Sequence, residues 1–130
     1  MTVVIQRSLN QENESQEIDL TALTAFGEMT TDGEPDVVVE LIDLYLKDGA
    51  ERVTQIKHAA VTADRILLKN VVHTFKGSSG SLGFQKIVEL CEQLERLEGQ
   101  DNLNVLMEPL EFEFTRVCDA LWKFRQSRIG

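Results

Sequence analysis

From Ile18 onward, apolar residues recur every three or four positions, the spacing of a helix that buries one side. The first such segment predicts a short helix over residues 19–29, with Asp19 as its N-cap. Residues 31–35 form a predicted turn, and Pro35 suits the first position of the next helix because no helical hydrogen bond is lost there. The apolar side of the short helix carries Leu20, Leu23, Phe26 and Gly27.

The second predicted helix begins at Pro35, and Gly49 is expected to bend it or to divide it in two. Its start, Val37-Val38-Val39, is rich in residues that favour strands, but the run continues into a helical period. We therefore predict a helix here as well. Its apolar positions are Val38, Leu41, Ile42, Tyr45, Val53, Ile56 and Ala60.

Three further helices follow. Thr62 or Asp64 can cap the third, which ends near Gly83, and the fourth stops at Gly99. A fifth is capped by Asp101, and Pro109 within it predicts a kink or a break. Long amphipathic helices joined by short turns predict an all-α fold, an antiparallel four-helix bundle with a short additional N-terminal helix.

The length of 130 residues corresponds to one domain with a core of its own. Residues 6–17 are polar and lack a period, so residues 1–17 are predicted to be a flexible leader. We expect the bundle to span residues 18–126 and a short C-terminal tail to occupy residues 127–130.

The formal net charge of −9 disfavours binding to nucleic acid and to anionic membrane surfaces. Cys91 and Cys118 lie on or beside apolar stripes without a CxxC pattern, so we predict free thiols in a reducing compartment. The apolar start is too brief for a signal sequence, and no long apolar run follows, so we expect a cytoplasmic protein. Two histidines and no Glu-x-x-His pair leave no set of ligands for a metal site.

The third predicted helix has an unusual outward face. His73, Lys76, Gly77 and Gly80 recur at i, i+3, i+4 and i+7 and so share one side. Each mid-helix glycine costs about 1 kcal/mol relative to alanine, so helix stability does not explain the pair. Close approach of a second macromolecule to the imidazole does explain bare backbone beside it. The inward stripe is predicted to hold Leu68, Val71 or Val72, Phe75, Ser78 or Ser79, and Leu82.

Histidine suits a phosphoryl carrier, because its ordinary pKa near 6.5 leaves a neutral nucleophilic nitrogen at cytosolic pH. The outer nitrogen, Nε2, is the accessible one, and the inner nitrogen then needs a partner for its proton. His73 lies ten residues before Gly83 and Glu95 twelve after it. These separations correspond to roughly 15 and 18 Å of helix, so Glu95 is a candidate to orient the ring.

The spacing His73-x-x-Lys76-Gly77-Ser78-Ser79-x-x-x-Gly83 resembles the signature of the histidine-containing phosphotransfer (HPt) domain family. The similarity extends from about Ile18 to Phe124, and the motif is specific because its positions hold fixed spacing on a predicted helix. Many members of the family carry glutamine where this chain has Glu95.

The resemblance implies a bundle whose exposed histidine accepts a phosphoryl group from one receiver aspartate and passes it to another. It implies a phosphocarrier without ATP-binding machinery or a cofactor of its own, since the Mg²⁺ belongs to the receiver. By analogy His73 is the phospho-acceptor, Lys76 stabilises the charge of the phosphoryl group and Gly77 provides clearance. The implied partners are response-regulator receiver domains, which apolar residues of the first two helices contact, and a hybrid sensor histidine kinase.

Two alternatives stay open: a bundle that binds a receiver or kinase without transfer, and the phosphotransfer segment of a larger hybrid sensor kinase. His58 has no glycine-bearing face and is predicted to be a solvated residue. A monomer is expected, because one face must stay free for docking. Lys69, Asn70, Gly80 and Lys86 are the further residues predicted to contact a partner.

Overall fold

The computed structural model describes residues 17–29, 36–97 and 103–129. These residues form five helices and no strand, so the predicted all-α class is confirmed. Residues 1–16, the turn over residues 31–35, the stop at Gly99 and the cap at Asp101 lie outside the described residues. The helices are α2 (Thr21–Glu28), α3 (Val37–Thr62), α4 (Arg65–Ser81), α5 (Gln85–Arg96) and α6 (Leu103–Ile129).

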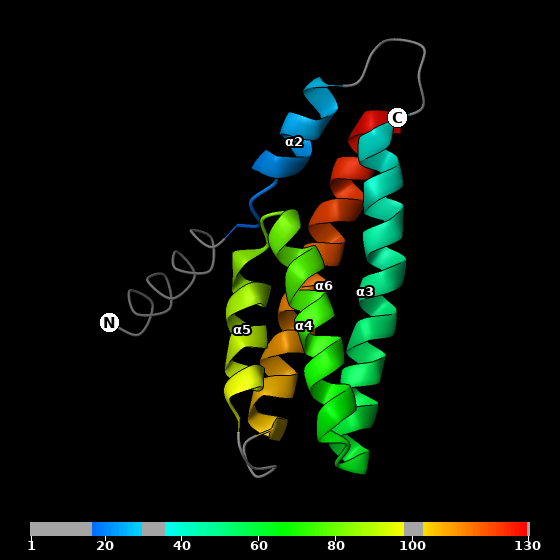
Figure 1. Ribbon diagram of the computed structural model, residues 1–130. Helices are drawn as coiled ribbons and strands as arrows, with labels where there is room; N and C mark the ends of the chain where they lie inside the picture. The colour runs from blue at the N-terminus through cyan, green and yellow to red at the C-terminus, as the bar shows by residue number, and fades with distance from the viewer. Residues whose placement is uncertain (1–16, 30–35, 98–102, 130) are drawn as a thin grey trace, which may run out of the picture.

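Helices α3 to α6 form an antiparallel bundle in which α4 packs between α3 and α5, and α6 closes the bundle against the same two helices (Figure 1). Helix α2 is the short additional helix, and it packs on the N-terminal part of α3 beyond the ends of α4 and α5. The apolar side chains of all five helices meet in one core, in which Tyr45, Phe75, Phe84 and Phe114 form an aromatic cluster.

Helix α3 is continuous through Gly49, so the alternative in which Gly49 divides the helix in two is wrong. Gly49 is buried, and a Cβ atom placed on it would lie 2.6 Å from Cε1 of the Phe114 ring. That separation is too short for a methyl group. The glycine therefore lets the Phe114 ring lie against the α3 backbone.

The helix starts differ in detail from the predicted ones. Asp36 caps α3 by accepting hydrogen bonds from the backbone N–H groups of Val38 and Val39, so α3 begins two residues after Pro35. Asp64, and not Thr62, caps α4. Leu20 occupies the N-cap position of α2, and Asp19 accepts the Thr21 N–H from one residue further back.

Helix α6 runs through Pro109 without a break, and Pro109 lies on its exposed side. The helix also continues to Ile129, past the expected end at residue 126. Two ion pairs hold this last part against α3: Arg125 with Asp43 at 2.6 Å and Arg128 with Asp36 at 2.8 Å. Residues 127–129 are therefore helix and not tail.

Candidate functional site

Helix α4 has one side that is buried in the core and one side that is exposed to solvent. Its inward side chains are buried in the core. Val71 and Val72, which the sequence pattern left as alternatives, are both buried. On the opposite side the His73 side chain is 77% exposed. The helix thus fixes a solvent-facing imidazole on a rigid support. The buried residues of the inward side are Val71, Val72, Phe75, Ser79 and Leu82.

The two adjacent serines of the motif have different surroundings. Ser79 is fully buried and shares a hydrogen bond of 2.7 Å with the Tyr45 hydroxyl of α3. Ser78 is half-buried and donates to the Phe75 carbonyl within its own helix. Burial strongly raises the pKa of Tyr45, so this hydroxyl stays protonated and able to pair with Ser79. The hydrogen bond joins α3 to α4 behind the exposed face.

Glu95 of α5 lies beside His73, as the helical hairpin predicted. Oε2 of Glu95 is 3.7 Å from Nδ1 of His73, a separation that is longer than a hydrogen bond. The turn between α4 and α5 depends on Gly83, whose φ of +86° is a conformation that favours glycine. The hairpin therefore places the carboxylate next to the inner ring nitrogen, which leaves Nε2 as the outer one.

Lys76 has a partner that the sequence did not reveal. Its Nζ donates to Oε1 of Glu95 at 2.7 Å, so one carboxylate contacts both the lysine and the imidazole ring. The hydrogen bond to Glu95 raises the pKa of Lys76 above its usual value, which keeps the ammonium group charged at neutral pH. The equal heights of residues 73 and 95 were readable from the sequence. The side-chain direction of Lys76 was not.

Gly77 and Gly80 are exposed on the same face, but they differ in what surrounds them. A Cβ atom on Gly77 would meet nothing within 4 Å, whereas one on Gly80 would lie 3.5 Å from Cγ2 of Val88 in α5. Neither separation forbids a side chain. The packing of the described residues therefore does not require glycine at position 77.

The remaining candidates lie at different distances from His73 along the bundle. Lys69 and Asn70 are exposed on α4, one turn before His73. Lys86 lies at the start of α5, where it lines an open hollow with Glu113 of α6 and residues 17–19. Lys86 lies three residues after Gly83, whereas His73 lies ten residues before it. The structure therefore does not bring Lys86 together with His73.

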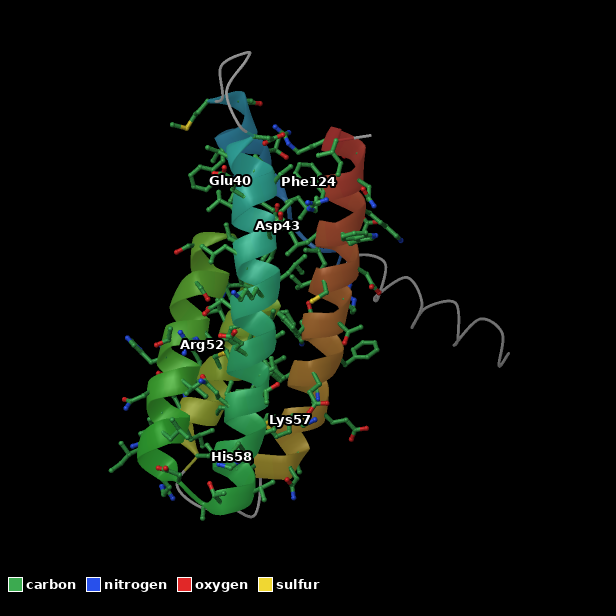
Figure 2. All side chains as sticks on the ribbon, turned by 90° about the vertical axis from the view of Figure 1, so that its right-hand side faces the viewer. Glu40, Asp43, Arg52, Lys57, His58 and Phe124 are labelled. Atoms are coloured by element: carbon green, nitrogen blue, oxygen red, sulfur yellow. The ribbon has the colours of Figure 1, made fainter. Side chains whose placement is uncertain are left out.

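The expectations about the other histidine and the thiols agree with the structure. His58 is exposed near the end of α3, and Figure 2 shows it near the opposite end of that helix from Glu40. Cys91 and Cys118 are free, and burial raises the pKa of Cys91 to about 12 and that of Cys118 to about 11. Within residues 17–29, 36–97 and 103–129, no three His, Cys, Asp or Glu side chains form a cluster that could hold a metal ion.

Exposed apolar side chains gather on α2 and on the first half of α3. They are Phe26, Met29, Val37 and Leu44. The sequence pattern placed Phe26 on the packed side of the short helix, but its side chain is 39% exposed, and the buried residue of α2 is Leu23. Among the described helices, none is long and apolar enough to cross a membrane.

Comparison with known proteins gives a consistent result. The Hpt domain family profile matches residues 40–124, which include the α4 face and Glu95. Histidine-containing phosphotransfer protein 1 of Oryza sativa subsp. japonica is 32% identical over 95 residues, which cover 70% of this chain and 63% of the rice protein. Histidine-containing phosphotransfer protein 2 of Arabidopsis thaliana is 31% identical over 71 residues, 52% of this chain and 46% of that protein.

The solved structure of histidine-containing phosphotransfer protein B from Pseudomonas aeruginosa PAO1 is also similar. It superposes with a TM-score of 0.73 at 26% sequence identity, over 85% of this chain and 96% of the bacterial chain. The match to the rice protein spans less than two thirds of that relative's length. The similarity therefore covers the helical domain with its exposed histidine.

Proposed function

Because the chain belongs to the Hpt domain family, we propose that it is a phosphocarrier that accepts a phosphoryl group on His73 from one receiver-domain aspartate and passes it to another. The observation that carries this proposal is the α4 face. A histidine that is 77% exposed stands beside a glycine at which a Cβ atom would meet only open space. Such a face suits a partner whose aspartyl phosphate must come within bonding distance of the ring.

The transfer step uses the outer ring nitrogen. Nε2 attacks the phosphorus of the aspartyl phosphate, the N–P bond forms, and the aspartate oxygen leaves with its electron pair as a carboxylate. Nδ1 keeps its proton, and the Glu95 carboxylate 3.7 Å away stabilises the positive charge that the ring gains. Glu95 is in this proposal the positioning residue for the ring. The reverse step returns the phosphoryl group to a second aspartate.

Lys76 and Glu95 act together in this proposal. A phosphoryl group adds about two negative charges at neutral pH, and an unpaired Glu95 would repel it. The ammonium group of Lys76, one helical turn from His73, neutralises Glu95 before transfer and attracts the phosphoryl oxygens afterwards. The carboxylate thus holds the lysine close to the place where the new charge appears.

The receiver is proposed to dock over α4 and over the exposed apolar residues of α2 and α3. Gly80 lies on the same side of α4 as His73, and Lys69 and Asn70 lie one turn before it. These positions fit the border of such an interface. The position of Lys86 does not favour a role there. A hybrid sensor kinase is proposed as the upstream source of the phosphoryl group, and the cytoplasm as the place of the exchange. The apolar residues of the docking surface are Phe26, Met29, Val37 and Leu44.

The test is phosphoryl transfer from receiver domains that carry a phosphoryl group from a small-molecule donor. Wild type and His73→Gln are compared by intact mass and by the acid lability of the adduct. His58→Gln is the matched control, since it removes the other exposed histidine. We expect an acid-labile adduct on wild type and on His58→Gln, and none on His73→Gln. ATP alone is expected to phosphorylate none of the three.

Two other outcomes would change the conclusion. If receivers bind wild type and His73→Gln equally and phosphorylate neither, the chain is a regulatory bundle that binds without transfer. If ATP alone phosphorylates the wild-type chain, it is no pure phosphocarrier.

A further inference from the structure

Arg128, in the last turn of α6, lies where three helices meet. Figure 1 shows this end of α6 beside the start of α3. Nε of Arg128 donates to Oδ2 of Asp36, the N-cap residue of α3, at 2.8 Å. A Cβ atom on Gly27 of α2 would lie 2.9 Å from Nη1, 3.1 Å from Nη2 and 3.3 Å from Cζ of the same arginine. The guanidinium group therefore lies against the α2 backbone while it binds the start of α3.

Asp36 holds this guanidinium group with one carboxylate oxygen and caps α3 with the other. Oδ1 accepts the N–H groups of Val38 and Val39, and Oδ2 accepts from Arg128. The hydrogen bond from Arg128 lowers the pKa of Asp36 below its usual value, so the carboxylate stays charged at neutral pH. The arginine that packs on α2 is thus tied to α3 by an ion pair.

Helix α2 depends on contacts with the rest of the bundle. It has eight residues, and a helix of that length is marginal in water without tertiary contacts. Within Thr21–Glu28, Leu23 is the one buried residue, and the last turn carries no basic side chain. Arg128 supplies a positive charge at that end, where it offsets the negative end of the helix dipole. The contact with Arg128 is therefore a large part of what can hold the end of α2.

The two residues that Arg128 contacts are chain neighbours of the proposed docking surface. Gly27 follows Phe26, and Asp36 precedes Val37. One part of that surface belongs to α2 and the other part to α3. The guanidinium group lies next to both parts, so it is placed to fix one relative to the other.

We propose that Arg128 is a positioning residue that fixes the α2 part of the docking surface against the α3 part, so that a receiver meets a preformed surface. This inference rests on the proposed function, to which the docking surface belongs. A surface that is formed in only a fraction of the molecules binds with an affinity reduced by that fraction. Loss of Arg128 therefore acts on receiver affinity and leaves the chemical step at His73 unchanged.

Arg125 offers a close comparison one turn earlier in α6. It also pairs with a carboxylate of α3, that of Asp43 at 2.6 Å. Both guanidinium groups lie over an aromatic ring of α6, at 5.7 and 5.8 Å from the ring centroid. The three atoms nearest to a Cβ on Gly27 all belong to Arg128. A role in stability alone makes the two arginines equivalent, whereas a role in placing α2 does not.

The experiment compares Arg128→Gln with Arg125→Gln in the full chain. Amide hydrogen exchange of α2 reports whether that helix is held, and titration with a receiver domain gives the dissociation constant. For Arg128→Gln we expect faster exchange in α2, unchanged exchange in α4 and a dissociation constant about ten-fold higher. The transfer rate at saturating receiver should equal that of wild type. Arg125→Gln should leave α2 exchange and receiver affinity within about two-fold of wild type.

A second variant removes the same ion pair from its other side. Asparagine is as good an N-cap as aspartate, so Asp36→Asn keeps the cap of α3 and removes the carboxylate that binds Arg128. It should raise the dissociation constant as Arg128→Gln does. Because both changes break one contact, the double variant should bind no more weakly than either single variant.

Three results would overturn the inference. The first is α2 exchange in Arg128→Gln that equals that of wild type. The second is a receiver dissociation constant that Arg128→Gln and Arg125→Gln raise equally. The third is a wild-type chain that no receiver binds, which removes the docking surface itself. Failure of the phosphocarrier proposal looks different, because receivers then bind wild type without transfer and their dissociation constants still distinguish the two arginines.

Discussion

Two glycines in the middle of long helices, Gly49 and Gly77, are present for opposite reasons. Gly49 is buried, and a Cβ atom on it would lie 2.6 Å from the Phe114 ring. Gly77 is exposed, and a Cβ atom on it would meet nothing within 4 Å. Both glycines cost helix stability by about the same amount, roughly 1 kcal/mol each. At Gly49 that cost allows the Phe114 ring to pack. At Gly77 no side chain of the described residues packs in the space that glycine leaves open.

In the proposed function, this contrast separates a glycine that serves folding from a glycine that serves a partner. A substitution at Gly49 should act on stability and leave the transfer rate of the folded protein unchanged. A substitution at Gly77 should do the reverse.

Gly77→Leu is expected to lower the rate of phosphoryl transfer from a receiver by about 100-fold, because a side chain beside His73 holds the reacting atoms apart. The same change should raise the free energy of unfolding by up to about 1 kcal/mol, since leucine favours the helix. Stopped-flow or quench-flow transfer rates and urea unfolding measure the two effects. Ala50→Leu, at an exposed position of α3, is the control and should leave the transfer rate unchanged. An unchanged rate in Gly77→Leu would remove the clearance role.

Gly49→Ala is expected to lower the free energy of unfolding by about 2 kcal/mol, because the cost of overpacking against Phe114 exceeds the gain in helix propensity. Urea unfolding of wild type and variant gives the difference. The transfer rate, measured under conditions in which both proteins are folded, should be the same. A variant that is as stable as wild type would show that the ring can move aside, and Gly49 would then lose its packing role.

Tyr45→Phe is expected to cost about 1.5 kcal/mol of stability, because it leaves the buried Ser79 hydroxyl without its hydrogen-bond partner. The double variant with Ser79→Ala removes both hydroxyls, so it should be less destabilised than the sum of the two single variants. Urea unfolding of the four proteins completes the cycle. Additive effects would mean that this hydrogen bond does not join α3 to α4.

Glu95→Gln is expected to reduce the transfer rate about ten-fold, since an amide stabilises the charged ring less than a carboxylate does. It should also lower the pKa of Lys76 toward its usual value, because the hydrogen bond to Glu95 is the main cause of the raised pKa. Quench-flow kinetics and NMR titration of the lysine follow the two effects. Glu89→Gln, an exposed change on the same helix, is the control. Equal rates for the two variants would exclude Glu95 as a positioning residue.

The sequence predicted the features that depend on the geometry of a single helix or of one helical hairpin. The inward stripe of α4, the position of His73 and the level of Glu95 follow from helical period and rise. The contacts that the sequence did not reveal join residues far apart in the chain. Gly49 looked like a break because its partner, Phe114, lies in another helix.

The same limit applies to two other details. Lys86 was predicted to contact a partner, and that role stays a prediction, because the structure shows only that Lys86 lies on the side of α5 that faces Glu113. The end of α6 extends past residue 126, where Arg128 binds Asp36 across the bundle, a contact that no helical period encodes. Side-chain direction and cross-chain pairing required the structure.

The open space at Gly77 has a consequence for how signalling routes stay separate in a cell. In the proposed function, the backbone at Gly77 is open to any receiver whose aspartate can reach His73, so the site of transfer does not discriminate between partners. In the proposed function, selectivity is encoded away from it, on the exposed apolar residues Phe26, Met29, Val37 and Leu44. A carrier built in this way can be rewired to a new route by changes at one end of the bundle, while the chemical step is inherited unaltered.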